Sequence, residues 1–299
     1  MYKNLNPVLL SIDLEVTNIC MNNCSICPRE EIKRKRAFMG FETLKNLVKA
    51  FNEFRPLITI SGMGDPLLHP ELPEFIRYLR MGRFRVGVVV NIASLINLNP
   101  TIFKKVVESK PNIITVSIPS IETTTLEKIY NKGIKPELIL SKCEEMFSHY
   151  RKEVPLRALG VITDFNENPQ AYRGFFNISY NIPVWITKIH SRGGNLKRSL
   201  LYRGRDVRVN EGCNLFLFHS FIDAEGNLLS CCHDLTGETK FAHISEGGRE
   251  ILMKKREIIK GVPYFQICNR CDEPLRFMKL PKNLESLTFE GLTKKVKIY

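Results

Sequence analysis

The chain lacks the features that would place a protein in or across a membrane. No apolar run approaches the ~20 residues needed to span a bilayer. The first residues, MYKNLNPVLLSIDLEV, have no long apolar core or small-residue cleavage site, and Asp13 and Glu15 interrupt them. Low-complexity segments and fixed-period repeats are also absent. We therefore expect a cytoplasmic protein with no membrane partner.

Acidic residues are scarce relative to basic ones. The 299 residues include 44 Lys and Arg against 31 Asp and Glu, a formal net charge of +13. This balance fits a solvated surface, an anionic substrate, an acidic redox protein or a nucleic acid. Nucleic acid is not expected, because we find no appended RNA-binding domain or aromatic-basic motif.

The pattern of apolar residues predicts an α/β fold. Runs typical of buried strands, at 9–16, 57–61, 84–90, 112–118, 156–162 and 183–189, alternate with helical segments at 41–54, 70–80, 100–109, 123–130, 136–150 and around 169–176. Such alternation produces a parallel sheet, either open or rolled into a barrel. In both cases the ligand site lies at the carboxyl ends of the strands.

The pattern changes after about residue 195. A basic, glycine-rich stretch (192–212) is typical of a linker, and the apolar runs within 216–231, separated by the turn DAEGN, predict a β-hairpin. A helix (246–259) and the pair CNRC follow. We expect a main domain at 1–195, a small C-terminal module at 196–285 and a tail at 286–299.

Three cysteines follow the first expected strand at spacing C-x3-C-x2-C: Cys20, Cys24 and Cys27. A structural zinc site closes with four ligands, and no histidine lies within forty residues of the triplet. Clustered thiols in a reducing compartment indicate metal binding or catalysis rather than disulfides. Three cysteines can hold three irons of a 4Fe–4S cluster and leave the fourth open to an exogenous ligand.

A second group of cysteines lies in the C-terminal module. It consists of Cys213, Cys231 or Cys232, and the pair Cys268 and Cys271. Four cysteines at these spacings could close a zinc ribbon or hold an iron–sulfur cluster. The ninth cysteine, Cys143, is expected to be a buried apolar residue on a helix.

The triplet after the first strand of a repeated βα sheet resembles the radical S-adenosylmethionine (SAM) superfamily, over the first ~195 residues. The resemblance implies a partial TIM-like barrel of about six parallel strands. It also implies a 4Fe–4S cluster on Cys20, Cys24 and Cys27 whose open iron is chelated by SAM. Reductive cleavage of SAM then yields methionine and a 5′-deoxyadenosyl radical, which abstracts hydrogen from the substrate.

Further motifs match the family in order. The segment SGMGDP resembles the glycine-glycine-glutamate-proline motif whose backbone receives the SAM amino group, although Met63 and Asp65 depart from its commonest form. The strand ends that follow supply an asparagine, a ribose-binding serine and apolar contacts to adenine. The SAM-binding residues implied by these matches are Gly62, Met63, Gly64, Asp65, Asn91, Ser117, Val161 and Ile162. Pro119 stands where many members have an acid, and a strand-end Asn or Ser can equally be a turn residue.

The second cysteine group, the hairpin and the helix resemble the auxiliary-cluster module called twitch, a shortened SPASM domain. One auxiliary 4Fe–4S cluster is implied, with ligands Cys213, Cys231, Cys268 and Cys271; Cys231 is favoured over Cys232. Such a cluster can accept the second electron of a two-electron oxidation. Relatives with this layout include an aminocyclitol dehydrogenase.

The substrate is expected between the SAM site and the module. Arg192 is a candidate to bind it, beside glycines that permit close approach of ligand or backbone, while His190 and Asp234 are candidate bases. Structural roles are the alternatives for both. Cys232 could return a hydrogen atom to substrate, as in radical epimerases, or be a spectator.

We expect dehydrogenation of a polar small molecule such as a sugar or cyclitol. The alternatives are a peptide-modifying enzyme, an epimerase and, more distantly, a zinc-containing RNA-binding protein. The basic run 33–36, KRKR, could dock an acidic flavodoxin or ferredoxin that donates the electron, or could be solvated.

Overall fold

The computed structural model describes residues 9–130, 133–164, 168–197, 201–204, 206–207 and 209–277. The expected tail, 286–299, and the last part of the expected module, 278–285, lie outside the described residues. Six parallel strands form the main sheet: β1 (Ser11–Leu14), β2 (Leu57–Ile60), β3 (Val86–Asn91), β4 (Ile113–Ser117), β5 (Leu156–Ile162) and β6 (Val184–Lys188).

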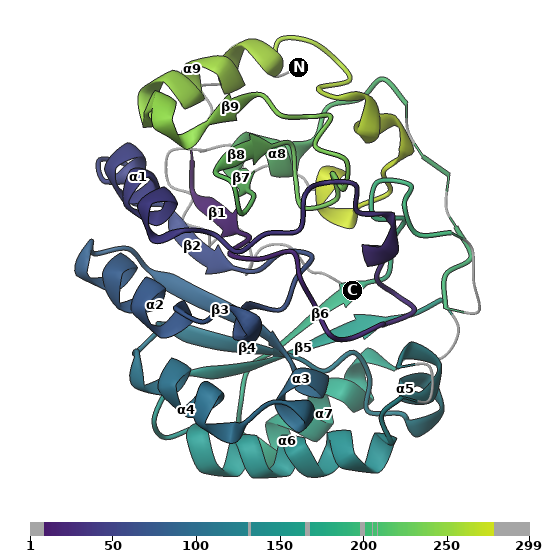
Figure 1. Ribbon diagram of the computed structural model, residues 1–299. Helices are drawn as coiled ribbons and strands as arrows, with labels where there is room; N and C mark the ends of the chain where they lie inside the picture. Colours follow the sequence, from purple (N-terminus) through teal and green to yellow (C-terminus); the bar gives the residue numbers. More distant parts are fainter. Residues whose placement is uncertain are drawn as a thin grey trace.

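The six strands lie side by side in chain order, as in a partial TIM-like barrel (Figure 1). Strand β6 pairs only with β5 among the described residues, so the barrel is open. The expected α/β class and all six expected strands are confirmed.

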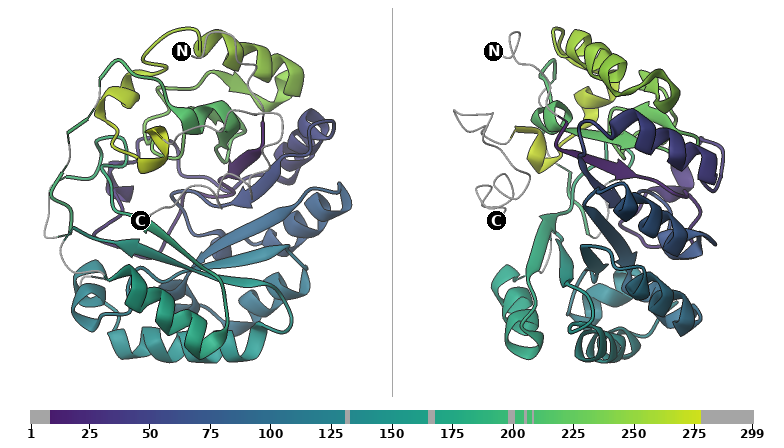
Figure 2. Two further views of the ribbon diagram at one scale, coloured as in Figure 1. Left: turned by 180° about the vertical axis from the view of Figure 1, so that it is seen from behind. Right: turned by 90° about the vertical axis from the view of Figure 1, so that its left-hand side faces the viewer.

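Helices cover the outer face of the curved sheet (Figures 1 and 2). They are α1 (Phe41–Phe51), α2 (Leu72–Met81), α3 (Ile92–Asn97), α4 (Pro100–Glu108), α5 (Thr123–Ile129), α6 (Pro136–Tyr150) and α7 (Pro169–Tyr180), with short 3-10 turns at Arg29–Glu31 and Pro66–Leu68. Apolar strand residues such as Ile12 and Leu14 share one buried core with helix residues such as Leu47 and Phe51. The other face of the strands lines the barrel interior. Cys143 of α6 is buried in this core, as expected.

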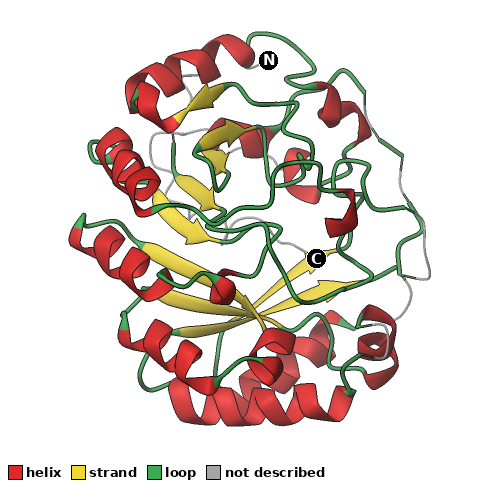
Figure 3. Ribbon diagram, in the orientation of Figure 1, coloured by secondary structure: helices red, strands yellow, loops and turns green. Residues whose placement is uncertain are grey.

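The C-terminal module extends the same sheet. Its strand β7 (His219–Ile222) pairs in parallel with β1, and β8 (Asn227–Leu229) and β9 (Ala242–His243) continue the sheet in antiparallel fashion (Figure 3). Helices α8 (Asn214–Phe218) and α9 (Gly248–Ile258) and 3-10 turns at Ile244–Glu246, Gln266–Arg270 and Pro274–Phe277 complete it. The sheet therefore runs through the expected domain boundary, and the division at residue 195 stays a prediction.

The expected hairpin is present but shorter than the sequence indicated. Its turn is held by Asp223, whose Oδ1 accepts hydrogen bonds from the N–H groups of Glu225 (3.0 Å) and Asn227 (2.9 Å). Gly226 has a φ of +87° in this turn, and a Cβ there would lie 2.8 Å from Ile244 Cδ1. Residues 216–218, expected as strand, form the end of α8 instead, and Phe216 packs its ring against Tyr264 and Phe265.

None of the helices in the described part of the chain combines the length and apolar character that crossing a bilayer requires.

Candidate functional site

The cysteine triplet lies in the loop after β1, at the carboxyl edge of the sheet. The Cys27 N–H donates to the Cys24 carbonyl (3.0 Å), and the Asn22 N–H donates to Cys20 Sγ (3.4 Å). Burial raises the pKa of the Cys24 thiol to about 12, and Cys27 and Cys20 add to the rise. The three thiols therefore lie within electrostatic range of one another, a donor set that favours a bound cation.

Arg29, which the sequence reasoning missed, stabilises this loop. Its Nη1 donates to the Cys20 carbonyl, and only 13% of its side chain is exposed. Burial raises the pKa values of Cys20, Cys24 and Cys27, and the charge of Arg29 opposes this rise for each of them. Its position, two residues after Cys27, is the feature of the sequence that could have indicated this role.

The segment Gly62–Pro66 packs directly on the triplet loop. The Asp65 N–H donates to the Ile19 carbonyl (2.8 Å), and Asp65 Oδ1 accepts from the Leu67 N–H (3.0 Å). A Cβ on Gly64 would lie 2.1 Å from the Thr17 carbonyl oxygen, so this position needs glycine. The predicted SAM-binding segment thus contacts the start of the loop that carries the cysteine triplet.

A buried ion pair, also missed from the sequence, lies under both loops. Glu15 is fully buried at the end of β1, pairs with Arg34 Nη1 (2.5 Å) and accepts the Met63 N–H (2.9 Å). Arg34 Nε donates to the Asp234 carbonyl (3.1 Å). Arg34 is therefore a structural link between the barrel and the C-terminal module, whereas Lys33, Lys35 and Arg36 of the same basic run are exposed.

The remaining predicted SAM contacts lie at neighbouring strand ends. Asn91 pairs in register with Ser117, and Val161 and Ile162 end the adjacent β5. Asn91 Oδ1 accepts from the Ala93 N–H (2.8 Å) and from the Tyr130 hydroxyl (3.1 Å), so it also caps α3. These SAM contacts stay predictions.

The module brings its own cysteines together through a buried arginine. Arg276 is 1% exposed, and its guanidinium donates to the carbonyls of Cys268, Cys271 (2.9 Å), Gly212 (3.2 Å) and Glu211 (2.9 Å). Burial raises the pKa of Cys213 to about 12, and the charges of Cys268 and Cys271 add to it. No sequence pattern marks this arginine, because the segments that it joins are far apart in the chain.

Cys231 and Cys232 point to different surroundings. Burial raises the pKa of both thiols; the next contributors for Cys231 are Cys232 and Cys271, whereas for Cys232 the next contributor is Asp13 of β1. Cys232 Sγ also lies 3.5 Å from His233 Nδ1. This geometry favours Cys231 as the fourth member of the group and places Cys232 toward the barrel interior.

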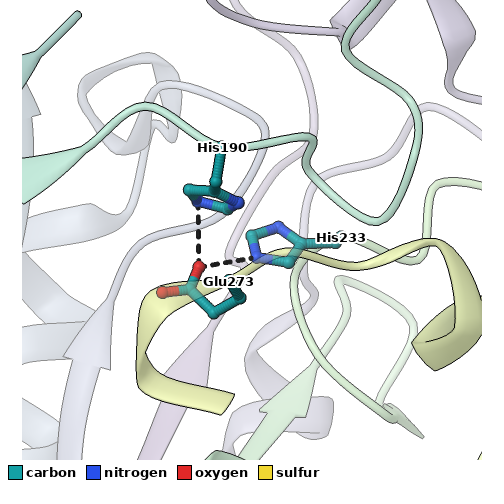
Figure 4. A group of neighbouring side chains, drawn as sticks. All are labelled: His190, His233 and Glu273. Carbon is teal, nitrogen blue, oxygen red and sulfur yellow. Dashed lines mark hydrogen bonds and ion pairs between the residues drawn. The ribbon is translucent and has the colours of Figure 1, made fainter. Parts of the chain in front are cut away.

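His190 belongs to a buried cluster with His233 and Glu273, two residues that the sequence reasoning missed (Figure 4). The Nε2 atoms of His190 and His233 lie 2.9 Å and 3.3 Å from Glu273 Oε2. The Arg192 N–H donates to His190 Nδ1 (3.3 Å), so Nε2 carries the proton that Glu273 accepts. A metal-binding histidine would need the opposite tautomer, and we interpret the cluster as a hydrogen-bonded link between β6 and the module. Both ring nitrogens of His190 are engaged, which favours its structural role.

Arg192 has an uncommon backbone conformation, with a φ of +51°. Burial raises the pKa values of Cys27 and Cys232, and the Arg192 charge opposes both rises, so the Arg192 side chain lies within electrostatic range of these two thiols. The adjacent Gly193 and Gly194 permit close approach of the module, because Cβ atoms there would lie 2.8 Å from Ile267 and Arg270.

Asp234 is fully buried in a turn of the module. Its two carboxylate oxygens accept hydrogen bonds from the backbone of Thr236, Gly237 and Thr239 and from both threonine hydroxyls. These bonds outweigh burial and lower the pKa of Asp234. The arrangement favours the structural alternative over a role as substrate base.

Sequence and structure comparisons agree with this geometry. The profile described as "Radical SAM superfamily" matches residues 14–172, more than half of the chain. The chain belongs to the radical SAM superfamily. Radical SAM enzymes use a 4Fe–4S cluster and SAM, so this protein is a radical SAM enzyme with a cysteine triplet suited to that cluster.

Solved structures share the fold of this radical SAM enzyme. BtrN, in complex with AdoMet and 2-DOIA, aligns with a TM-score of 0.59 and 16% identity over 90% of this chain and 95% of BtrN. Streptococcus suis SuiB, bound to the precursor peptide SuiA, aligns with a TM-score of 0.66 and 12% identity over 89% of this chain and 72% of SuiB. The protein anSMEcpe with bound AdoMet aligns with a TM-score of 0.57 and 14% identity over 88% and 85% of the two chains.

Proposed function

We propose that this radical SAM enzyme is an oxidoreductase that removes two electrons from a polar small molecule, such as a sugar or cyclitol alcohol, and that it carries two 4Fe–4S clusters. Cys20, Cys24 and Cys27 would hold the first cluster, and Cys213, Cys231, Cys268 and Cys271 the second. Bound SAM would contact the predicted residues from Gly62 to Ile162. The observation that carries the proposal is the second group of cysteines, in which the buried Arg276 holds the Cys268–Cys271 loop against the segment that precedes Cys213.

The donor sets suit the two clusters. Each group gathers thiols whose mutual repulsion in the charged form is relieved by a bound cation. When bound, the first cluster and SAM would supply a radical that takes a hydrogen atom from the substrate; the auxiliary cluster would accept the remaining electron, and the hydroxyl proton would pass to water. Arg192, within electrostatic range of Cys27 and Cys232, would orient a hydroxyl group of the substrate. The buried Glu15–Arg34 pair would fix the two loops that hold cluster and SAM.

Peptide modification is the second candidate function. It is favoured by the likeness to SuiB, whose structure was determined with its precursor peptide. Cys232, directed toward the interior, would favour an epimerase in which this thiol returns a hydrogen atom. The BtrN structure contains the small molecule 2-DOIA and aligns over almost the whole length of both chains, and we rank the small molecule first for that reason.

The test is a metal and product analysis of protein purified without oxygen. We expect about eight irons and eight sulfides per chain, and about four of each in the Cys268→Ala variant. Incubation with SAM and dithionite should release 5′-deoxyadenosine. About four irons in the wild type, with the same number in Cys268→Ala, would contradict the proposed auxiliary cluster. Bound zinc in place of iron would favour the RNA-binding alternative. A product two mass units lighter than its substrate distinguishes oxidation from epimerisation, which leaves the mass unchanged.

A further inference from the structure

Arg157 is a cation on the interior face of the barrel. It lies near the start of β5, where residues alternate between the two faces of the sheet. Gly160 faces the outer helices, because a Cβ there would lie 2.7 Å from the Tyr172 ring of α7. Arg157, Leu159 and Val161 therefore face the interior.

The guanidinium of Arg157 contacts one hydroxyl and one aromatic ring. Its Nε and Nη2 both donate to Thr115 Oγ1, at 3.2 Å and 2.9 Å, and its Cζ lies 4.6 Å from the ring centroid of Trp185. No acidic side chain in the described part of the chain pairs with it. Burial alone lowers the pKa of Arg157 to about 10, with no opposing contribution from a carboxylate.

Arg157 is half-buried, and a cation that is partly removed from water without a counter-charge is costly for a folded protein. Removing a charged group from water costs several kcal/mol, and proteins recover this with a counter-charge or a ligand. A hydroxyl oxygen and the face of an indole ring orient the guanidinium but do not neutralise it. The planar guanidinium fork matches carboxylate and phosphate groups, which accept two parallel hydrogen bonds.

We propose that Arg157, oriented by Thr115 and Trp185, is a binding subsite for an oxyanion of the substrate, a carboxylate or a phosphate group. The inference rests on the proposed function and narrows its substrate class to anionic molecules. Thr115 pairs in register with Arg157, and Ser117 pairs with Leu159 one pleat further along the same face. Two residues of strand span about 7 Å, so the subsite lies directly beneath the strand ends predicted to bind SAM.

The chain contains a single tryptophan, which makes Trp185 a specific reporter of this subsite. The experiment measures Trp185 fluorescence of the anaerobic, iron-loaded protein during titration with inorganic phosphate, with succinate and with the neutral succinamide, at constant ionic strength. We expect a saturable change with at least one anion and none with succinamide. The stronger of the two anions tells whether the substrate group is a phosphate or a carboxylate.

Three variants complete the test. Arg157→Gln should weaken anion binding at least tenfold, Arg157→Lys should retain part of it as a point charge, and Arg77→Gln on the exposed face of α2 should leave it unchanged. Anion binding that is absent, or equal in wild type and Arg157→Gln, would overturn the proposal. It would also be overturned if SAM alone changed the fluorescence in an Arg157-dependent manner, because SAM would then supply the anion. The fluorescence titration requires no turnover. Its failure can therefore be told apart from a failure of the proposed function, which the iron count and the 5′-deoxyadenosine assay test.

Discussion

Cys231 and Cys232 are consecutive in the chain but lie in different surroundings, and we assign them different chemical roles. The module turns sharply here, with the Asp234 N–H donating to the Cys231 carbonyl (3.2 Å). Cys231 is influenced by Cys271 of the second cysteine group, whereas Cys232 is influenced by Asp13, Arg192 and Glu273. We therefore assign the first thiol to the proposed auxiliary cluster and the second to the surroundings of Arg192.

This difference predicts opposite results for two matched variants. Cys231→Ser should lower the iron content by about four per chain, because the proposed auxiliary cluster would lose one of its four thiolates and has no SAM to take the open iron. Cys232→Ser should keep about eight irons and the iron–sulfur absorbance. Anaerobic iron and sulfide analysis measures both. If Cys232→Ser lost the iron instead, the ligand assignment would have to be exchanged.

At the scale of elements, two loops and the ends of three strands, β3, β4 and β5, form the predicted SAM site. The loop after β2 contacts the loop after β1 through the hydrogen bond from Asp65 to Ile19 and through Glu15, which accepts the Met63 N–H. Gly64 permits this contact because its Cα faces the Thr17 carbonyl without a side chain. The two loops can therefore approach this closely only because residue 64 is a glycine.

Gly64→Ala should therefore separate these loops. The new Cβ would collide with backbone at Thr17, which cannot rotate away, so we expect at least a tenfold weaker affinity for SAM and a lower melting temperature. Gly40→Ala is the matched control, because nothing lies within 4 Å of a Cβ there. Equilibrium dialysis with labelled SAM and thermal unfolding would measure the effects, and an unchanged SAM affinity in Gly64→Ala would contradict the proposed SAM site.

Local patterns predicted most elements, because the strands and helices follow the periods that burial on one or both faces requires. All six barrel strands and the hairpin turn were predicted in this way. Helix α3 was missed, since its six residues follow β3 without a break and only the Asn91 cap marks its start. Partners such as Glu15–Arg34, His190–Glu273 and Arg276 could not be predicted, because they join segments whose proximity depends on the complete fold.

At the scale of the whole molecule, the location of the exposed basic residues indicates where an acidic electron donor would dock. Lys33, Lys35 and Arg36 are exposed in the segment that follows the cysteine triplet, and the apolar side chains of Met21 and Phe38 in the same stretch of chain are also exposed. Arg34, between them, is 7% exposed in its pair with Glu15. A docking surface for an acidic electron donor would therefore use three of the four basic residues, and neutralising the fourth would damage the fold.

We expect the combined variant Lys33→Gln, Lys35→Gln and Arg36→Gln to slow cluster reduction by flavodoxin about tenfold at low ionic strength, because rim charges mainly steer association. The difference from wild type should shrink as salt is added, and reduction by the small reagent dithionite should not change. The control variant neutralises Lys104, Lys105 and Lys110, which are exposed around α4 on the outer face of the barrel. Stopped-flow absorbance of the iron–sulfur band gives both rates. Equal rates for the two variants would exclude the 33–36 run as the docking surface. Arg34→Gln, in contrast, should lower the thermal stability of the protein, because it removes one partner of the buried pair with Glu15.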